Sequence, residues 1–118
     1  MVKFTYEVVA GVNTALPGIY VHEIDGVNVY VGKYTNARRP FKAYARNVNG
    51  LIKGRPYHNK GSDYRRIHHE LAAAVREGRE VVIRIVENVT DAAARAARET
   101  ALIAEYRALG FARCNATP

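Results

Sequence analysis

The chain has 118 residues, 48% of them hydrophobic, with one cysteine and a formal net charge of +7 at pH 7. This length suits a single domain (residues 1–118) with a modest core, and no stretch approaches the ~20 consecutive apolar residues of a membrane span. One cysteine excludes an internal disulfide and a cysteine-rich zinc site, and because the N-terminus lacks the apolar region of a secretory signal, we expect a cytoplasmic protein.

β-Structure is expected first along the chain. Apolar residues alternate with more polar ones over residues 2–8, which predicts a short leading strand or an edge extension. The signatures Gly18-Ile19-Tyr20 and Tyr30-Val31-Gly32 then flank the turn sequence Asp25-Gly26-Val27-Asn28. Because the flanks are β-branched or aromatic, they predict a hairpin in which Asp25 and Gly26 adopt positive φ angles. Its strands would bring the phenols of Tyr20 and Tyr30 to one site.

Helical periodicity follows the hairpin. Apolar residues recur at helical spacing from Phe41 to Ile52, with Pro40 in the first turn and Gly54 at the end. This pattern predicts a helix over roughly 40–53. The next ten residues, 54–63, form a basic stretch with two glycines and a proline, which is typical of a loop.

The second half of the chain predicts the order helix, strand, helix. Its β-branched strand has the nearly continuous apolar run of a strand that is covered on both faces. The whole order therefore predicts a small α/β (α+β) domain. The expected elements are a helix from Tyr64 to Gly78 capped by Ser62 or Asp63, a strand over 81–86, and a helix from Thr90 or Asp91 to about Leu109.

Positive charge is concentrated between residues 33 and 66. This segment holds ten Lys and Arg residues against one acidic residue, so it carries +9 while the rest of the chain carries −2. Interleaved aromatic residues make the pattern typical of a polyanion site, and a basic solvated face is the alternative. We expect DNA to contact the segment through Arg38, Lys42, Arg46, Lys53, Arg55 and Lys60.

The last helix carries a carboxylate on its apolar side. Helical spacing places Glu99 in the middle of an apolar line that runs from Ala92 to Leu109. Burial of a carboxylate lowers the free energy of unfolding by several kcal/mol unless the group is paired or binds a metal ion. Two interpretations stay open: an ion pair with an arginine such as Arg95 or Arg84, or a metal ligand aimed at the hairpin.

Five elements in chain order resemble the GIY-YIG nuclease family. They are Gly18-Ile19-Tyr20, Tyr30-Val31-Gly32-Lys33, Arg38-Arg39, Arg98-Glu99 and Asn115. The resemblance covers residues 18–115. It implies a small three-stranded antiparallel sheet that contains the hairpin and is flanked by helices. It also implies a DNA endonuclease that depends on Mg²⁺ (or Mn²⁺).

The resemblance implies a role for each matching residue. Tyr20 would be the general base or would orient the attacking water, and Tyr30 would hydrogen-bond at the same centre. Arg39 would stabilise charge on the phosphoryl oxygens, Glu99 would hold one metal ion per active site, and Asn115 would support the site. A free phenol has a pKa near 10, so nearby cations would have to lower that value for base catalysis. A single inward carboxylate favours one metal ion over a paired-metal site.

The roles of several supporting residues stay open in the sequence. Lys33 would add to the positive field at the tyrosines. Which of Arg38 and Arg39 faces the site is left open, because Pro40 follows them directly. Tyr44 loosely fits a supporting position of the family, but it also lies on the apolar line of its helix, which favours core packing.

The histidines are weaker candidates. His58 either contacts phosphate or is an exposed loop residue, and His68 can face the site from the second helix. His22 shares a strand face with Tyr20 but lies further from the strand end. No histidine has a metal-ligand partner at useful spacing, so a zinc site is not expected.

The C-terminal end of the sequence bears on specificity. The chain ends three residues after Asn115, so we expect no separate recognition domain. Sequence preference would then come from residues 34–66, from a homo-oligomer or from a partner protein. The alternative to a nuclease is a catalytically inactive nucleic-acid-binding module with the same fold. Such a module has no need of the inward Glu99, which favours the enzyme.

Overall fold

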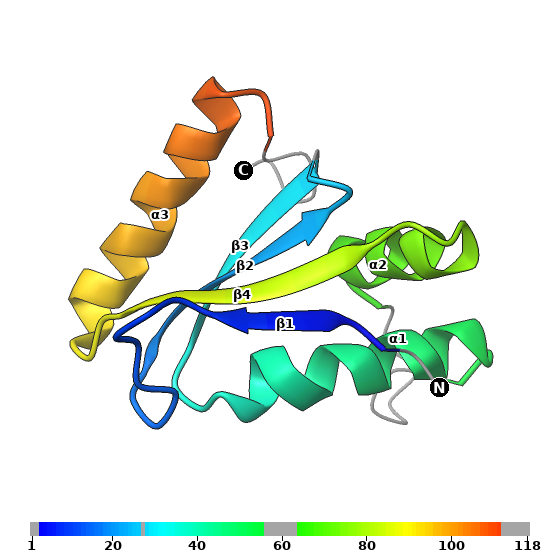
Figure 1. The fold of residues 1–118 in the computed structure, drawn as a ribbon, viewed down its shortest axis with the longest axis horizontal. Helices are drawn as coiled ribbons and strands as arrows, with labels where there is room; N and C mark the ends of the chain where they lie inside the picture. Colours follow the sequence, from blue (N-terminus) through cyan, green and yellow to red (C-terminus); the bar gives the residue numbers. More distant parts are fainter. Residues whose placement is uncertain (1–2, 27, 56–63, 112–118) are drawn as a thin grey trace.

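The computed structural model describes residues 3–26, 28–55 and 64–111. These residues form one sheet with helices on both of its faces (Figure 1). In chain order the elements are β1 (Thr5–Val8), β2 (Gly18–Ile24), β3 (Asn28–Tyr34), a π-helical turn η1 (Arg39–Ala43), α1 (Tyr44–Ile52), α2 (Arg66–Arg76), β4 (Val81–Asn88) and α3 (Ala92–Ala108).

The sheet has four strands in the order β1-β4-β2-β3, which corrects the three-stranded antiparallel sheet implied by the resemblance. β2 pairs antiparallel with β3 and β4, whereas β1 runs parallel to β4 on its other side. The hairpin covers only one edge of β4, so the main-chain groups of the opposite edge need another partner. β1 supplies it, and the buried Phe4 anchors its start. The predicted leading strand is therefore confirmed as an edge strand.

The hairpin forms as its turn chemistry predicts. Ile24 pairs with Asn28, and the turn between them contains Asp25 at a φ of 53° and Gly26 at a φ of 66°. Aspartate and glycine tolerate this left-handed region better than other residues do. The turn sequence thus fixes the register of β2 against β3.

Two apolar cores lie on opposite faces of the sheet. α1 and α2 cover the larger core and α3 covers the smaller one, as the arrangement in Figure 1 shows. Alternate residues of β4 are buried in the larger core, whereas the residues on its other face are only partly buried. The prediction that both faces are covered therefore holds fully for one face. The smaller core comprises Ile19, Val21, Val29 and Val31, packed against Leu102, Ile103, Tyr106 and others.

The helices largely match their predicted positions. The helix expected over 40–53 is divided into η1 and α1, with the buried Pro40 in the first turn of η1. α2 begins at Arg66, two residues later than expected, and its N-cap residue is Arg65 instead of Ser62 or Asp63, which lie outside the described residues. None of the helices in the described part of the chain is long and apolar enough to cross a membrane.

α3 begins where the sequence predicts, but its buried apolar face ends before Leu109. The carboxylate of Asp91 accepts a hydrogen bond of 2.8 Å from the backbone N–H of Ala94, which confirms this residue as the N-cap. Leu109, which was expected at the inward end of the line, is 68% exposed. Leu109 follows the last residue of the helix and does not pack against the sheet, so the prediction that it lies in the core was wrong.

Candidate active site

The hairpin brings its two signature tyrosines to the same face of the sheet. Tyr20 lies opposite Gly32, and Tyr30 lies opposite His22. The ring centroids of Tyr20 and Tyr30 are 6.5 Å apart, and His22 lies 5.1 Å from the first ring and 5.5 Å from the second. The sequence pattern therefore places both phenols correctly, but it undervalues His22, which strand pairing puts between them.

The glycines of both signatures are explained by close approach. A Cβ atom at Gly32 would overlap the far end of the Tyr20 ring, so glycine makes room for this buried phenol. A Cβ atom at Gly18 would overlap the backbone carbonyl of Glu87 on β4. The register shift between β2 and β4 falls one residue after Gly18, between Ile19 and Tyr20. The glycine of each signature thus helps to position Tyr20. Gly18 does so from the same strand, and Gly32 does so from the paired strand of the hairpin.

A cluster of polar groups surrounds the hydroxyl of Tyr44, which is buried in the larger core. This hydroxyl lies 2.6 Å from that of Tyr20, at hydrogen-bonding distance. Nη2 of Arg65, from the start of α2, donates a hydrogen bond of 3.0 Å to it. Arg39 lies close enough to interact electrostatically with Tyr44, and the ring centroid of Tyr30 is 6.4 Å from that of Tyr44. Tyr44 is therefore a core residue that also links Tyr20 to the basic groups of the site.

Burial keeps the hairpin phenols protonated at neutral pH. Burial, and then the neighbouring Tyr44, raises the pKa of Tyr20 well above its ordinary value of 10. The same two causes raise the pKa of Tyr30 to about 12. The charges of Arg39 and Arg65 act in the opposite direction but are smaller effects. The arginines of the protein therefore do not bring these pKa values below 10, and both phenols can donate hydrogen bonds.

Two histidines that the sequence ranked low belong to this cluster. His22 and His68 are both fully buried, on β2 and on α2. Their rings lie 4.5 Å and 5.7 Å from that of Tyr44, centroid to centroid. Burial, followed by the charges of Arg65 and His68, lowers the pKa of His22 to about 3, so this imidazole is neutral. Alternation along β2 gives the face of His22, whereas only the packing of α2 brings in His68 and Arg65.

Glu99 lies with α3 on the opposite side of the sheet from this cluster. Its Oε1 atom is 3.5 Å from Nζ of Lys33, on the edge strand β3. Neither arginine considered from the sequence is its partner, because Arg84 pairs with Glu7 and Glu23, and Arg95 donates to backbone carbonyls. Glu99 contributes a small electrostatic effect to Tyr30, so the carboxylate acts on the cluster around the sheet edge without contacting it.

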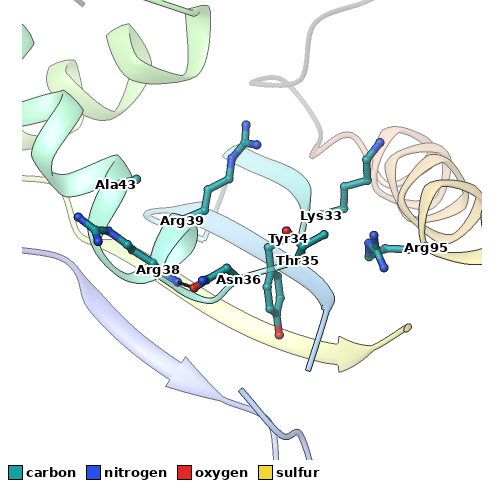
Figure 2. Close-up of a pocket in the computed structure, with 8 residues that line it drawn as sticks. All are labelled: Lys33, Tyr34, Thr35, Asn36, Arg38, Arg39, Ala43 and Arg95. Carbon is teal, nitrogen blue, oxygen red and sulfur yellow. Dashed lines mark hydrogen bonds between the residues drawn. The ribbon is translucent and has the colours of Figure 1, made fainter. Parts of the chain in front are cut away.

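A cationic pocket opens beside the cluster, at the end of β3. It has a volume of about 410 Å³, and none of its lining residues is acidic. Figure 2 shows the guanidinium groups of Arg38 and Arg39 pointing in different directions. Because Arg39 interacts electrostatically with Tyr20 and Tyr44, it is the arginine that joins the pocket to the tyrosines. The pocket is lined by Lys33, Tyr34, Thr35, Asn36, Arg38, Arg39, Ala43 and Arg95.

The residues predicted to contact DNA lie on η1, on α1 and just after it. Arg38, Lys42 and Arg46 line a second depression, of about 350 Å³, and are exposed, as are Lys53 and Arg55. No acidic residue interrupts the sequence from 38 to 55. The predicted residues His58, Lys60 and Asn115 lie outside the described part of the chain.

Among the described residues, no three His, Cys, Asp or Glu side chains gather closely enough to form a metal site by themselves. Comparison of the chain with protein-family models, curated proteins and solved structures finds no match. Any function must therefore be argued from the geometry of the tyrosine–arginine cluster and its pocket.

Proposed function

We propose that the protein is a Mg²⁺-dependent endonuclease of the GIY-YIG type that hydrolyses phosphodiester bonds in DNA. The observation that carries this proposal is the position of Arg39. Its side chain lines the open cationic pocket and also interacts electrostatically with Tyr44 and Tyr20, whose hydroxyls lie 2.6 Å apart. A phosphate group in the pocket would therefore meet a guanidinium that is backed by three phenols.

The charges suit the transition state of phosphodiester hydrolysis. Negative charge grows on the phosphoryl oxygens during attack, and preorganised donors stabilise it. Arg39 has this role, with Lys33 beside it in the pocket lining. Because burial keeps Tyr30 protonated and its side chain is only partly buried, its hydroxyl donates to the attacking water or to a phosphoryl oxygen. Tyr20 hydrogen-bonds with Tyr44 and so orients the neighbouring groups, and because its pKa is raised it does not act as a free base.

Glu99 fits the chemistry of a Mg²⁺ site. Magnesium is often held by one or two carboxylates, and water and substrate phosphate oxygens complete its coordination. The ion pair with Lys33 is formed by Oε1 of Glu99, at 3.5 Å. A bound Mg²⁺ ion would neutralise charge on the phosphate and lower the pKa of water. Glu99 would hold the ion, and Lys33 would orient the carboxylate.

The competing function is a nucleic-acid-binding module without catalysis. Two observations favour it: Tyr20 is only 1% exposed, and Glu99 lies on the far side of the sheet from the phenols. Both candidates predict DNA binding, so only the reaction separates them. In the binding module, the cationic residues would matter for affinity and the carboxylate would not matter at all.

The test is cleavage of supercoiled, linear and branched DNA by the purified protein, with Mg²⁺ and with EDTA. We expect cleavage with Mg²⁺ alone, and a loss of at least about 10²-fold in Glu99→Gln and in Arg39→Ala. Two controls are matched: Glu105→Gln on the same helix, where Glu105 pairs with Arg98, and Arg76→Ala, which changes an exposed arginine at the end of α2. Each should cut at a rate close to the wild type when DNA is saturating.

The outcomes separate the two functions. DNA binding without cleavage, unchanged in Glu99→Gln, would establish the binding module. Cleavage that persists in EDTA or in Glu99→Gln would refute the proposed metal ligand. Tyr30→Phe should lose about 10²-fold or more in activity, which is more than a packing role explains, while the protein remains folded.

A further inference from the structure

A buried guanidinium on α3 has no acidic partner. Arg95 is only 8% exposed, and Nη1 donates to the carbonyls of Val89 and Thr90, at 3.1 Å each. Among the described residues, no carboxylate forms an ion pair with Arg95. Several kcal/mol are typically lost when an unpaired charge is buried. The position of Arg95 is therefore unfavourable unless an anion approaches it.

The start of α3 makes this position still more positive. Arg95 is the fourth residue of the helix, where the unpaired N–H groups give the helix end a partial positive charge. Acidic residues are favoured in this turn and basic residues are disfavoured. The carboxylate of Asp91 is already used to cap the N–H of Ala94. The partial positive charge of the helix end thus adds to the charge of the Arg95 guanidinium.

Arg95 faces the pocket from the side opposite to η1. Figure 2 shows Arg95 beside Lys33, with Arg39 across the pocket from them. Three elements, β3, η1 and α3, therefore each contribute cations to one cavity, and the polar side chains of Thr35 and Asn36 lie between them. Its volume of about 410 Å³ lies within the range of small-molecule sites.

We propose that this pocket is a phosphate-binding site anchored by Arg95. Guanidinium groups bind phosphate with paired N–H donors, and the planar fork suits this anion better than an ammonium does. Arg95 and Lys33 would bind one side of the phosphate, and Arg38 and Arg39 would bind the other. That the phosphate belongs to a nucleic acid rests on the proposed function. The affinity of the pocket for phosphate does not.

Two sources can supply this phosphate. One is a backbone phosphate next to the bond that is cut, and the other is the terminal phosphate of a DNA end. The lining is the same for both, and Arg39 links the pocket to the tyrosines in either case. Oligonucleotides of one sequence, with a 5′-phosphate or a 5′-hydroxyl, distinguish them.

The test measures binding in EDTA, so that no reaction contributes. Inorganic phosphate and the two oligonucleotides are titrated by calorimetry into the wild type and Arg95→Met. We expect phosphate to bind the wild type and to bind Arg95→Met at least 10-fold more weakly. The matched control is Arg98→Met, since Arg98 lies on the same helix, outside the pocket, and pairs with Glu87 and Glu105. Its affinity for phosphate should be unchanged.

A second set of variants keeps the proposal testable if Arg95→Met does not fold. Arg38→Gln and Lys33→Gln alter exposed side chains of the same pocket, and each should weaken phosphate binding about 3- to 10-fold. Equal phosphate affinity in all folded variants would overturn the proposal, as would the absence of phosphate binding by the wild type.

The oligonucleotides assign the source and separate this proposal from the nuclease. A tighter complex with the 5′-phosphate, lost in Arg95→Met, supports a terminal phosphate, while equal weakening of both oligonucleotides supports a backbone phosphate. Phosphate binding through Arg95 by a protein that cuts no DNA would leave the pocket established and refute the proposed function. Cleavage by the wild type, with a phosphate affinity that is unchanged in Arg95→Met, would support the proposed function and refute the Arg95 phosphate site.

Discussion

At the residue scale, the hydroxyl of Tyr44 is the most connected atom of the site. It joins the hairpin, through Tyr20, to α2, through Arg65, and it also interacts electrostatically with Arg39 of η1. Core packing explains the ring of Tyr44 but not the polar contacts at its end. Since a buried polar group is costly when it loses its partner, this hydroxyl contributes to stability as well as to geometry.

A double-mutant cycle tests this contribution. Tyr44→Phe should lower the free energy of unfolding by about 1–3 kcal/mol, because it leaves the buried hydroxyl of Tyr20 without its partner. Tyr20→Phe should cost a similar amount, and the double variant should cost less than the sum. Urea unfolding at pH 7 provides the three values. Additive effects would show that the two hydroxyls do not interact.

A second prediction at this scale concerns acid stability. His22 has a pKa of about 3 in the folded protein, against about 6.5 when unfolded. Between these values the unfolded chain binds a proton that the folded chain does not, so the free energy of unfolding rises with pH. The slope is up to about 1.4 kcal/mol per pH unit. Stability is lost as pH falls below about 6.5.

Comparison of variants isolates this effect from that of the carboxylates. His22→Leu should retain its stability better than the wild type between pH 6.5 and pH 4, as measured by urea unfolding. His69→Gln changes an exposed histidine on α2 and serves as the control, with the pH dependence of the wild type. Parallel curves for the wild type and His22→Leu would contradict a depressed pKa at His22.

At the element scale, local sequence specifies the pieces of this fold better than their arrangement. Asp25 and Gly26 form the predicted turn, and Asp91 caps α3. The insertion of β4 between β1 and β2 pairs segments that are far apart in sequence, and no local pattern encodes it. The same limit applies to the site. Alternation places Tyr20 and His22 on one face, but the contribution of Arg65 depends on how α2 packs.

The hairpin also supports a prediction about Gly32. Gly32→Ala would drive a methyl group into the buried ring of Tyr20, so it should lower the free energy of unfolding by about 1–3 kcal/mol. Tyr20→Leu removes the ring atoms that this methyl group meets. Gly32→Ala should therefore cost less in the Tyr20→Leu background than in the wild type. An equal cost in both backgrounds would assign the loss to β3 alone.

At the scale of the whole molecule, charge is distributed unevenly over the fold. The cations of η1 and α1 lie on the same side of the sheet as the tyrosine cluster, with no acidic residue among them in sequence. Sequence composition revealed this asymmetry, but not the pocket, because Arg95 joins it from a helix more than fifty residues later. Binding through such a surface depends on phosphates more than on bases.

The salt dependence of DNA binding tests this distribution. Affinity should fall steeply with salt, with a log–log slope of about −0.9 per phosphate contacted on duplex DNA. Lys42→Glu with Lys53→Glu should flatten this slope and weaken binding to all sequences alike. The control reverses the same number of charges elsewhere, as Arg76→Glu with Arg107→Glu, near the ends of α2 and α3. Loss confined to one DNA sequence would instead indicate that the segment reads bases.

The parallel edge strand β1 has a consequence for how the molecule opens. All four of its residues are exposed, and its pairing joins Thr5 to Val82 across most of the chain. Few buried contacts resist its detachment, so its amides should exchange with solvent before those of β2. Detachment would turn the central strand β4 into an edge, with free main-chain donors and acceptors open to a strand from another molecule. β1 thus protects the sheet from self-association as much as it completes it.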